Sequence, residues 1–248
     1  MEENKFKFPT EIVELPSKGL VYPQDNPLSS GKIEMKYMTA KEEDILTNQS
    51  YIQNGTVLDK LLQSLIVSKI DYKDLIVGDK NALLIAARVL GYGKDYTFNY
   101  RGEEVTVDLS QLDNKPFNEK EFNQGKNEFT FKLPHSGNVI TFKLLTHGDE
   151  SAIEAEIKGL QKINKNASPE LSTRLKYIIL SINGDYEKKS IREFVDNEFL
   201  AMDSREFRKH IKQMQPDVNL SVTIETSNGM EDVEIPINLN FFWPDASI

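Results

Sequence analysis

Apolar residues over positions 56–93 recur at helical spacing and predict two packed helices. In the first helix they fall at i, i+3, i+4, i+7 and i+8, as Leu58, Leu61, Leu62, Leu65 and Ile66. Thr56 is placed to cap this helix, with Asp59 in its first turn. Asp79 is the expected N-cap of the second helix, and Gly91 its expected left-handed C-cap. We expect the two helices to pack as a hairpin.

After this segment the apolar period changes to 2, which is typical of strands. Residues 96–109 alternate on both sides of Arg101-Gly102 and predict a β-hairpin. A second hairpin is predicted over residues 129–145. Asn228-Gly229 predicts a third, between the alternating residues 218–224 and 233–237. The short hairpins should gain stability by adding strands or helices from elsewhere.

Helical spacing returns between the second and third hairpins. One amphipathic helix is predicted from Asp149 to Leu160, and another from Ser168, with Pro169 at its first position, to Ile182. Two shorter helices are predicted near residues 190–197 and 203–214.

The N-terminal part has no long periodic run. We expect a loose arm over residues 1–9, a short strand over 12–15 and a turn-rich wrapping segment that follows it. Residues 32–37 alternate as a strand, and Thr39 to Glu42 is a capping box that opens a short helix.

These elements predict an α+β fold of two loosely repeated units, each a helical hairpin followed by a β-hairpin. We expect an extended N-terminal arm over residues 1–31, the first unit over 32–115, a polar linker over 116–127 and the second unit over 128–248. Side-chain matches between the units are too sparse to establish a duplication.

Composition narrows the function classes. The 248 residues are 39% hydrophobic, which allows a sizeable core, and the net charge of −9 disfavours a protein that binds nucleic acid through phosphates. The chain has no cysteine, which excludes disulfides and cysteine-ligated zinc. We find neither a signal-peptide core nor an apolar run long enough for a membrane span, so we expect a soluble, intracellular protein without membrane contact.

Candidate catalytic and metal-binding groups are scattered. His135, His147 and His210 lie far apart in sequence, and His147 is expected to have a turn or capping role. Acidic clusters fall in predicted caps and turns, and residues 71–79 lack the ligand spacing of a calcium loop. No nucleophile elbow, phosphate loop or dinucleotide fingerprint is present. We therefore expect no catalytic residue, no cofactor and no metal.

The candidate functional residues have apolar side chains, which would contact other proteins. The candidate partner-binding residues are Leu15, Leu20, Tyr22, Phe241, Phe242 and Trp243. The three C-terminal aromatics either anchor the last strand in the core or form an exposed patch. The three N-terminal residues either wrap their own domain or lie on a neighbour.

Several strings of the chain resemble baseplate hub subunits and hub assembly proteins of T-even-type tailed bacteriophages. They are KIEMKYMTAKEEDILTN, DKLLQSLI and DLIVGDKNALLIAARVLGYG, followed by the Tyr96-Thr-Phe hairpin and the terminal NFFWP. The resemblance spans almost the whole chain and is densest over residues 32–109. The helical hairpin is also similar to tail assembly chaperones of other phages. Relatives can carry paired zinc-knuckle cysteines near residues 99–102, but this chain has none there, so the resemblance implies no metal.

The resemblance implies a non-enzymatic tail protein that acts in baseplate hub assembly. Its partners would be other hub or tape-measure proteins, met in the host cytoplasm during assembly and, for a permanent subunit, in the virion tail baseplate. The resemblance does not decide between a hub subunit and an assembly chaperone. It also leaves the oligomeric state open. The alternatives are a nucleic-acid-binding module that uses lysines and aromatics of the hairpins, and a carboxylate-based hydrolase.

Overall fold

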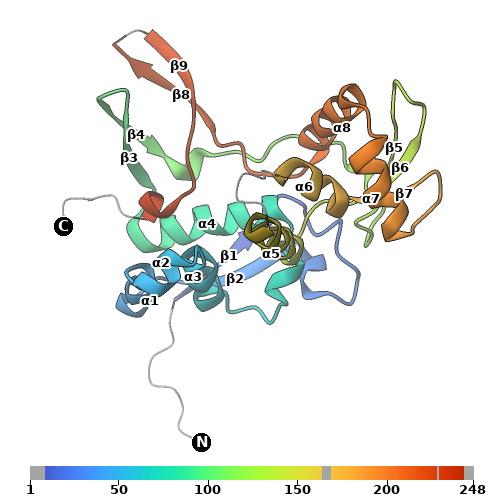
Figure 1. Cartoon of the computed structure of the whole chain (residues 1–248). Coiled ribbons are helices and arrows are strands. Elements are labelled where there is room, and N and C mark those ends of the chain that lie inside the picture. Colours follow the sequence, from blue (N-terminus) through green and yellow to red (C-terminus); the bar gives the residue numbers. More distant parts are fainter. Residues whose placement is uncertain (1–8, 164–168, 228, 243–248) are drawn as a thin grey trace, which may run out of the picture.

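The computed structural model describes residues 9–163, 169–227 and 229–242, and the expected loose arm lies almost wholly outside them. The described residues form eight α-helices, several short 3-10 helices and four small antiparallel sheets (Figure 1). The predicted α+β class is therefore confirmed. No helix of the described part has the length and apolar character that a membrane span requires.

Strands β1 (Thr10–Glu14) and β2 (Lys32–Lys36) pair antiparallel near the N-terminus. The loop between them contains the 3-10 helix η1 (Pro27–Ser30) and folds back on itself. Gly19 has a φ of +80°, and a Cβ there would lie 2.4 Å from the carbonyl oxygen of Ser29. Only glycine fits so close an approach of two backbone segments.

The first helical body comprises α1 (Ala40–Leu46), α2 (Gln49–Gln53), α3 (Val57–Leu65), the 3-10 helix η2 (Tyr72–Asp74) and α4 (Val77–Tyr92). Helix α3 buries Leu61, Leu62 and Leu65 completely and packs on α1 and α4. This confirms the predicted apolar stripe. The capping box is also present, with both Thr39 and Glu42 contributing their side chains. Helix α4 is buried along most of its length and is the central helix of this body.

Both predicted ends of α4 were wrong. The helix begins at Val77, with Ile76 at the N-cap position, so Asp79 lies inside the first turn. It continues to Tyr92 and stops at Gly93, whose positive φ of +84° favours glycine. Gly91 is helical instead, and a Cβ there would lie 2.9 Å from the end of the Met38 side chain, which would have to move.

Two of the hairpins lie side by side. They are β3 (Asp95–Tyr100) with β4 (Glu103–Asp108), and β8 (Ser221–Thr226) with β9 (Gly229–Glu234). Strands β4 and β8 are in contact, and the 3-10 helix η5 (Leu239–Phe242) packs on α4 (Figure 1). The C-terminal hairpin therefore returns to the first helical body.

The second body is built on a three-stranded antiparallel sheet of β5 (Phe129–Lys132), β6 (Val139–Phe142) and β7 (Ile179–Ile182). Helices α6 (Glu170–Ile178) and α7 (Lys188–Asn197) contact β7, and α8 (Ala201–Met214) packs its Phe207 against Phe131 and Phe142 of the sheet. Helix α5 (His147–Ile163) packs on α6 and on η2. The chain between the bodies contains η3 (Leu109–Gln111) and η4 (Glu119–Glu121). Strand β7 was predicted as the end of a helix, but its residues pair with β6, where Ile140 lies opposite Ile182.

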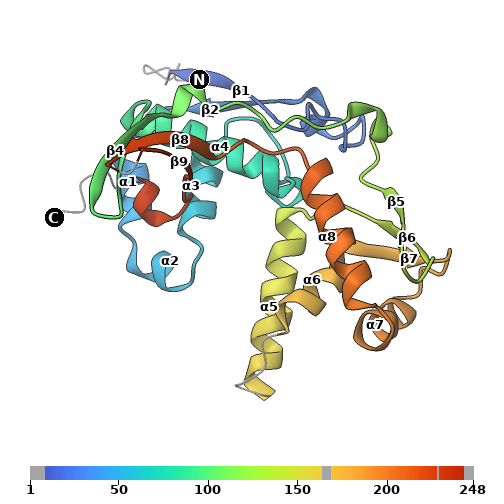
Figure 2. The ribbon, with the colours of Figure 1, turned by 90° about the horizontal axis from the view of Figure 1, so that it is seen from above.

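The two bodies meet at the N-terminus of α4. Figure 2 shows α4 with the hairpins on one side, the sheet with α7 and α8 on the other, and α5 extending away. The Val77 N–H donates to the Leu145 carbonyl, and the His147 N–H donates to the Leu75 carbonyl. A Cβ on Gly78 would lie 1.9 Å from the Pro216 carbonyl oxygen, so this junction also requires a glycine. The division into folding domains stays a prediction.

Candidate functional site

Most of the predicted partner-binding side chains lie inside the protein. Leu15, Tyr22, Phe241 and Phe242 are each at most 3% exposed. They are therefore core residues in this fold, which is the other of the two roles predicted for them, and they are not available as a contact surface. Leu20 is partly buried against the same core, and Trp243 lies outside the described residues.

Tyr22 is fixed by Asp79, a carboxylate with no exposed surface. The Asp79 carboxylate accepts hydrogen bonds from the Ser17 N–H at 2.9 Å, the Ser17 hydroxyl at 2.6 Å and the Tyr22 hydroxyl at 2.6 Å. Burial raises the pKa of Asp79 to about 6, against the opposing effect of these donors. The donors all belong to the loop between β1 and β2, so Asp79 ties that loop to α4.

Phe241 is held by Arg88, which is 1% exposed. The guanidinium donates to the carbonyl oxygens of Phe241 at 3.0 Å, Gly93 at 3.0 Å and Asp95 at 3.3 Å. Burial lowers the pKa of Arg88. One side chain of α4 thus fixes the C-terminal segment and the start of β3 together.

The other buried acids also have structural partners. Burial raises the pKa of Glu42, but hydrogen bonds from Lys36, Thr39 and Ser64 outweigh it and lower that pKa to about 2. Asp203 accepts from the N–H groups of His135 and Ser136 and so holds the β5–β6 turn. Because these buried carboxylates are enclosed and fully engaged, they are poorly placed to reach a substrate.

The histidines do not converge on a site. His147 packs edge-on against Tyr72 with 4.6 Å between ring centroids, and His210 stacks on Phe131 at 4.6 Å. Burial lowers the pKa of both histidines. His147 is the first residue of α5, as expected of a residue at a helix start, but Thr146 and Asp149 make the capping hydrogen bonds. The Thr146 N–H donates to the Asp149 carboxylate, and the Asp149 N–H donates to the Thr146 hydroxyl. Among residues 9–163, 169–227 and 229–242, no cluster of His, Asp and Glu has the geometry to hold a metal ion.

A groove of about 580 Å³ lies between β4 and β8, which contact each other over only part of their length. We call it the twin-hairpin groove; it is lined by residues 104–108, 111–112 and 222–225. Its tip is closed by contacts of Ser227 with Glu103, and its base by an antiparallel bridge between Asn114 and Val218. No sequence pattern predicted this groove, because it forms between hairpins more than 100 residues apart.

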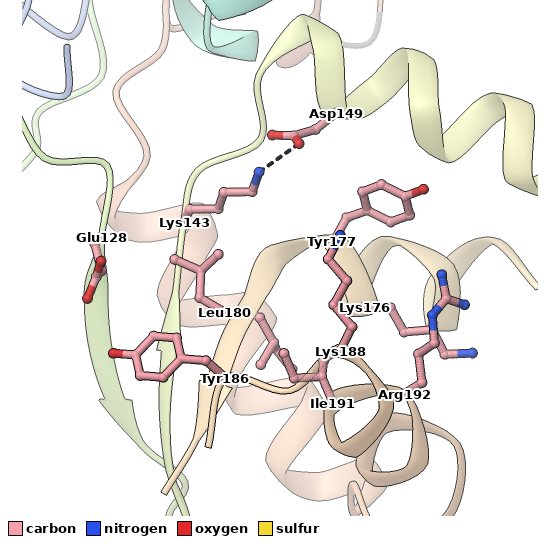
Figure 3. A pocket seen from close by; sticks show the side chains of 11 residues that line it. Glu128, Lys143, Asp149, Lys176, Tyr177, Leu180, Tyr186, Lys188, Ile191 and Arg192 are labelled. Atoms are coloured by element: carbon pink, nitrogen blue, oxygen red, sulfur yellow. Dashed lines mark hydrogen bonds and ion pairs between the residues drawn. The ribbon is translucent and has the colours of Figure 1, made fainter. Parts of the chain in front are cut away.

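A second hollow, of about 550 Å³, lies beside α6 and α7 (Figure 3). Its basic side chains are largely neutralised by neighbours. Lys143 pairs with Asp149 at 2.6 Å, Lys176 pairs with Asp196 at 2.6 Å, and Arg192 binds Glu156 through both terminal nitrogens. This hollow therefore offers little unpaired positive charge to an anion.

Comparison with protein families decides the class of the protein. The model of the T4 bacteriophage base plate protein family matches residues 9–243. The chain belongs to this family. Its role is accordingly structural and baseplate-related, among other phage baseplate proteins, as the resemblance implied at this coarser level. Comparisons with curated proteins and with solved structures gave no match.

Proposed function

We propose that this baseplate protein acts in assembly of the baseplate hub, as a hub subunit or as a chaperone for hub and tape-measure proteins. Family membership supports a baseplate role, and the resemblance to hub subunits and hub assembly proteins supports the hub in particular. The twin-hairpin groove carries the proposal, because two open strand edges face each other across it. Open edges are ready places for another chain to add.

The lining of the groove and the buried acids favour protein contacts over nucleic-acid binding and over hydrolase activity. The groove lining includes the carboxylates of Glu104, Asp108 and Glu225 and, within the described structure, no lysine or arginine. Such a lining repels nucleic-acid phosphates. The buried acids hold loops in place, so no observation favours a carboxylate-based hydrolase.

Removal of the gene from the phage tests the proposed function. We expect infected cells to accumulate incomplete hubs, because a required contact in hub assembly is missing. Electron microscopy and protein gels of purified tails measure this directly. Complete hubs at normal yield without the protein would contradict the proposal.

Affinity capture from infected cells distinguishes the two hub roles. A tagged protein is recovered at the stage of unfinished tails, and mature particles are probed for it separately. Presence in both indicates a subunit, whereas presence in unfinished tails alone indicates a chaperone. Capture with no hub or tape-measure protein at either stage would contradict the proposed function.

A further inference from the structure

We propose that the twin-hairpin groove binds one extended segment of a partner protein, with alternating apolar and basic residues, as an added strand between β4 and β8. The inference rests on the proposed function and specifies the chemistry of the partner. Within the described residues, β4 pairs with β3 alone and β8 with β9 alone, and no backbone hydrogen bond joins β4 to β8.

The register of each hairpin fixes which backbone groups face the groove. Tyr100 pairs with Glu103 and Thr226 pairs with Gly229 at the ends of the two hairpins. Residues of these closing pairs exchange backbone hydrogen bonds, so the backbone groups of every second residue along each strand point outward. On β4 the outward backbone groups are those of Glu104 and Thr106. On β8 they are those of Thr223 and Glu225. These N–H and C=O groups are available to an inserted strand.

The groove fits a short segment. The five lining residues of β4, positions 104–108, span roughly 17 Å at the rise of a β-strand. Contacts close both the tip and the base, so the segment must enter from the open face. Because β4 and β8 run in opposite directions, an inserted strand is antiparallel to one edge and parallel to the other.

Side-chain alternation sets the apolar half of the partner's pattern. Val105 and Ile224 are 9% and 5% exposed, yet neither belongs to the main hydrophobic cluster. Val107 and Val222 are partly buried beside the core. The alternate residues Glu104, Thr106, Thr223 and Glu225 are exposed. An added strand continues this division, so every second residue meets an apolar face.

The charges beside the groove determine which residues fit the polar positions of the partner segment. Glu104 and Glu225 pair with no basic side chain in the described part of the chain, whereas Asp108 is paired with Lys94 at 2.6 Å. Two unpaired carboxylates thus stand on the polar face of the two edge strands. Lysine or arginine at the outward positions of a partner strand would complement them.

Peptide binding to the full-length protein tests this inference. The probe is a fluorescent pentapeptide in which valine alternates with lysine or threonine, because five residues match the length of the groove. The control is a pentapeptide of the same composition in which the valines are grouped together and the polar residues follow them. We expect fluorescence anisotropy to show binding of the alternating peptide only. Equal binding of both peptides, or of neither, would overturn the inference.

Proline substitution tests the strand edge. Thr106→Pro removes an N–H that faces the groove, and an edge strand tolerates proline where the N–H is unpaired. Thr97→Pro is the matched control, because Thr97 lies opposite Thr106 and its N–H points to the far edge of β3. Both variants also lose the same bond between the two threonine hydroxyls. Thr106→Pro should weaken peptide binding about tenfold, as expected for about 1.4 kcal/mol, and Thr97→Pro should leave it unchanged. Equal effects of the two variants, both folded by circular dichroism, would contradict the inference.

Charge reversal and a second peptide identify the occupant. Glu104→Lys with Glu225→Lys should reduce binding of the basic peptide and remove most of its salt dependence. Residues 5–8 of this chain, Lys-Phe-Lys-Phe, share the alternating pattern. Tighter binding of a residue 4–8 peptide, with concentration-dependent dimerisation of the protein, would assign the groove to a second copy of this chain and overturn the inference.

Complementation separates this inference from the proposed function. If the gene is required for hubs but Thr106→Pro restores them as well as the natural protein does, the function stands and the groove inference fails. If hubs form without the gene, the proposed function fails, whatever the peptide result.

Discussion

At the residue scale, buried polar groups rather than exposed aromatics distinguish this protein. Asp79 was predicted as a helix cap because an acidic residue before an apolar run is a common start signal. Its partners Ser17 and Tyr22 are about 60 residues away in sequence, so no local pattern contains the network. The capping box of Thr39 and Glu42 was predictable, because it lies within four consecutive residues.

Asp79 makes the stability depend on pH. Its folded pKa of about 6 is above the value of about 4 expected in the unfolded chain, so the folded state binds the proton more tightly. Its contribution is fully present below pH 4 and is lost as the pH rises to about 6, by up to ~3 kcal/mol at about 1.4 kcal/mol per unit. Urea unfolding of natural protein and Asp79→Asn from pH 4 to 7 measures this, and the difference between them should change over that window. A constant difference would contradict the assignment.

At the element scale, periodicity located nearly every helix and hairpin but not every boundary. Residues 178–182, an apolar run without a clear period, were placed in a helix, although the last four form β7. A short apolar run fits either element, and the choice depends on pairing with β6, which is distant in sequence. The glycine that ends α4 was misplaced by two positions, because both glycines of the Gly91-Tyr-Gly93 triplet fit the pattern.

The apolar stripe of α3 should be essential for stability, because its leucines are fully buried. Leu62→Asp places an unpaired charge at a fully buried position and should cost several kcal/mol, enough to unfold a typical domain. Gln63→Asp is the control, because the next residue of the same helix is exposed. Thermal unfolding followed by circular dichroism compares the two. Melting of Leu62→Asp like that of the natural protein would mean that the stripe faces solvent.

At the scale of the whole molecule, the C-terminal hairpin returns to the first body. The sequence pattern predicted two consecutive units, with residues 128–248 in the second. The contacts of β8 with β4, and of η5 with α4, join the end of the chain to the first unit instead. We propose that residues 217–242 fold with residues 9–115. Sequence order alone could not show this, because the return depends on contacts such as that of Arg88 with Phe241.

Arg88 joins the C-terminal segment to the first helical body through its hydrogen bond to Phe241. Arg88→Met leaves three carbonyl groups without their donor and should cost about 2–4 kcal/mol, because hydrogen bonds to charged groups are among the stronger ones. Arg101→Met is the control: its side chain is 66% exposed, and its ion pair with Glu231 should contribute less than about 1 kcal/mol. Denaturant unfolding measures both, with hydrogen exchange of η5 as a local readout. Equal, small losses would show that Arg88 does not hold the C-terminal segment.

We propose that this baseplate protein engages its partner through the open edges of two adjacent hairpins. Backbone hydrogen exchange at Glu104, Thr106, Thr223 and Glu225 tests it most directly, in the free protein and in the hub intermediate captured from infected cells. We predict fast exchange at these four amides in the free protein and strong protection in the intermediate, with Val105 and Val107 protected in both states through β3. Unchanged exchange at the four outward amides on binding would contradict the account.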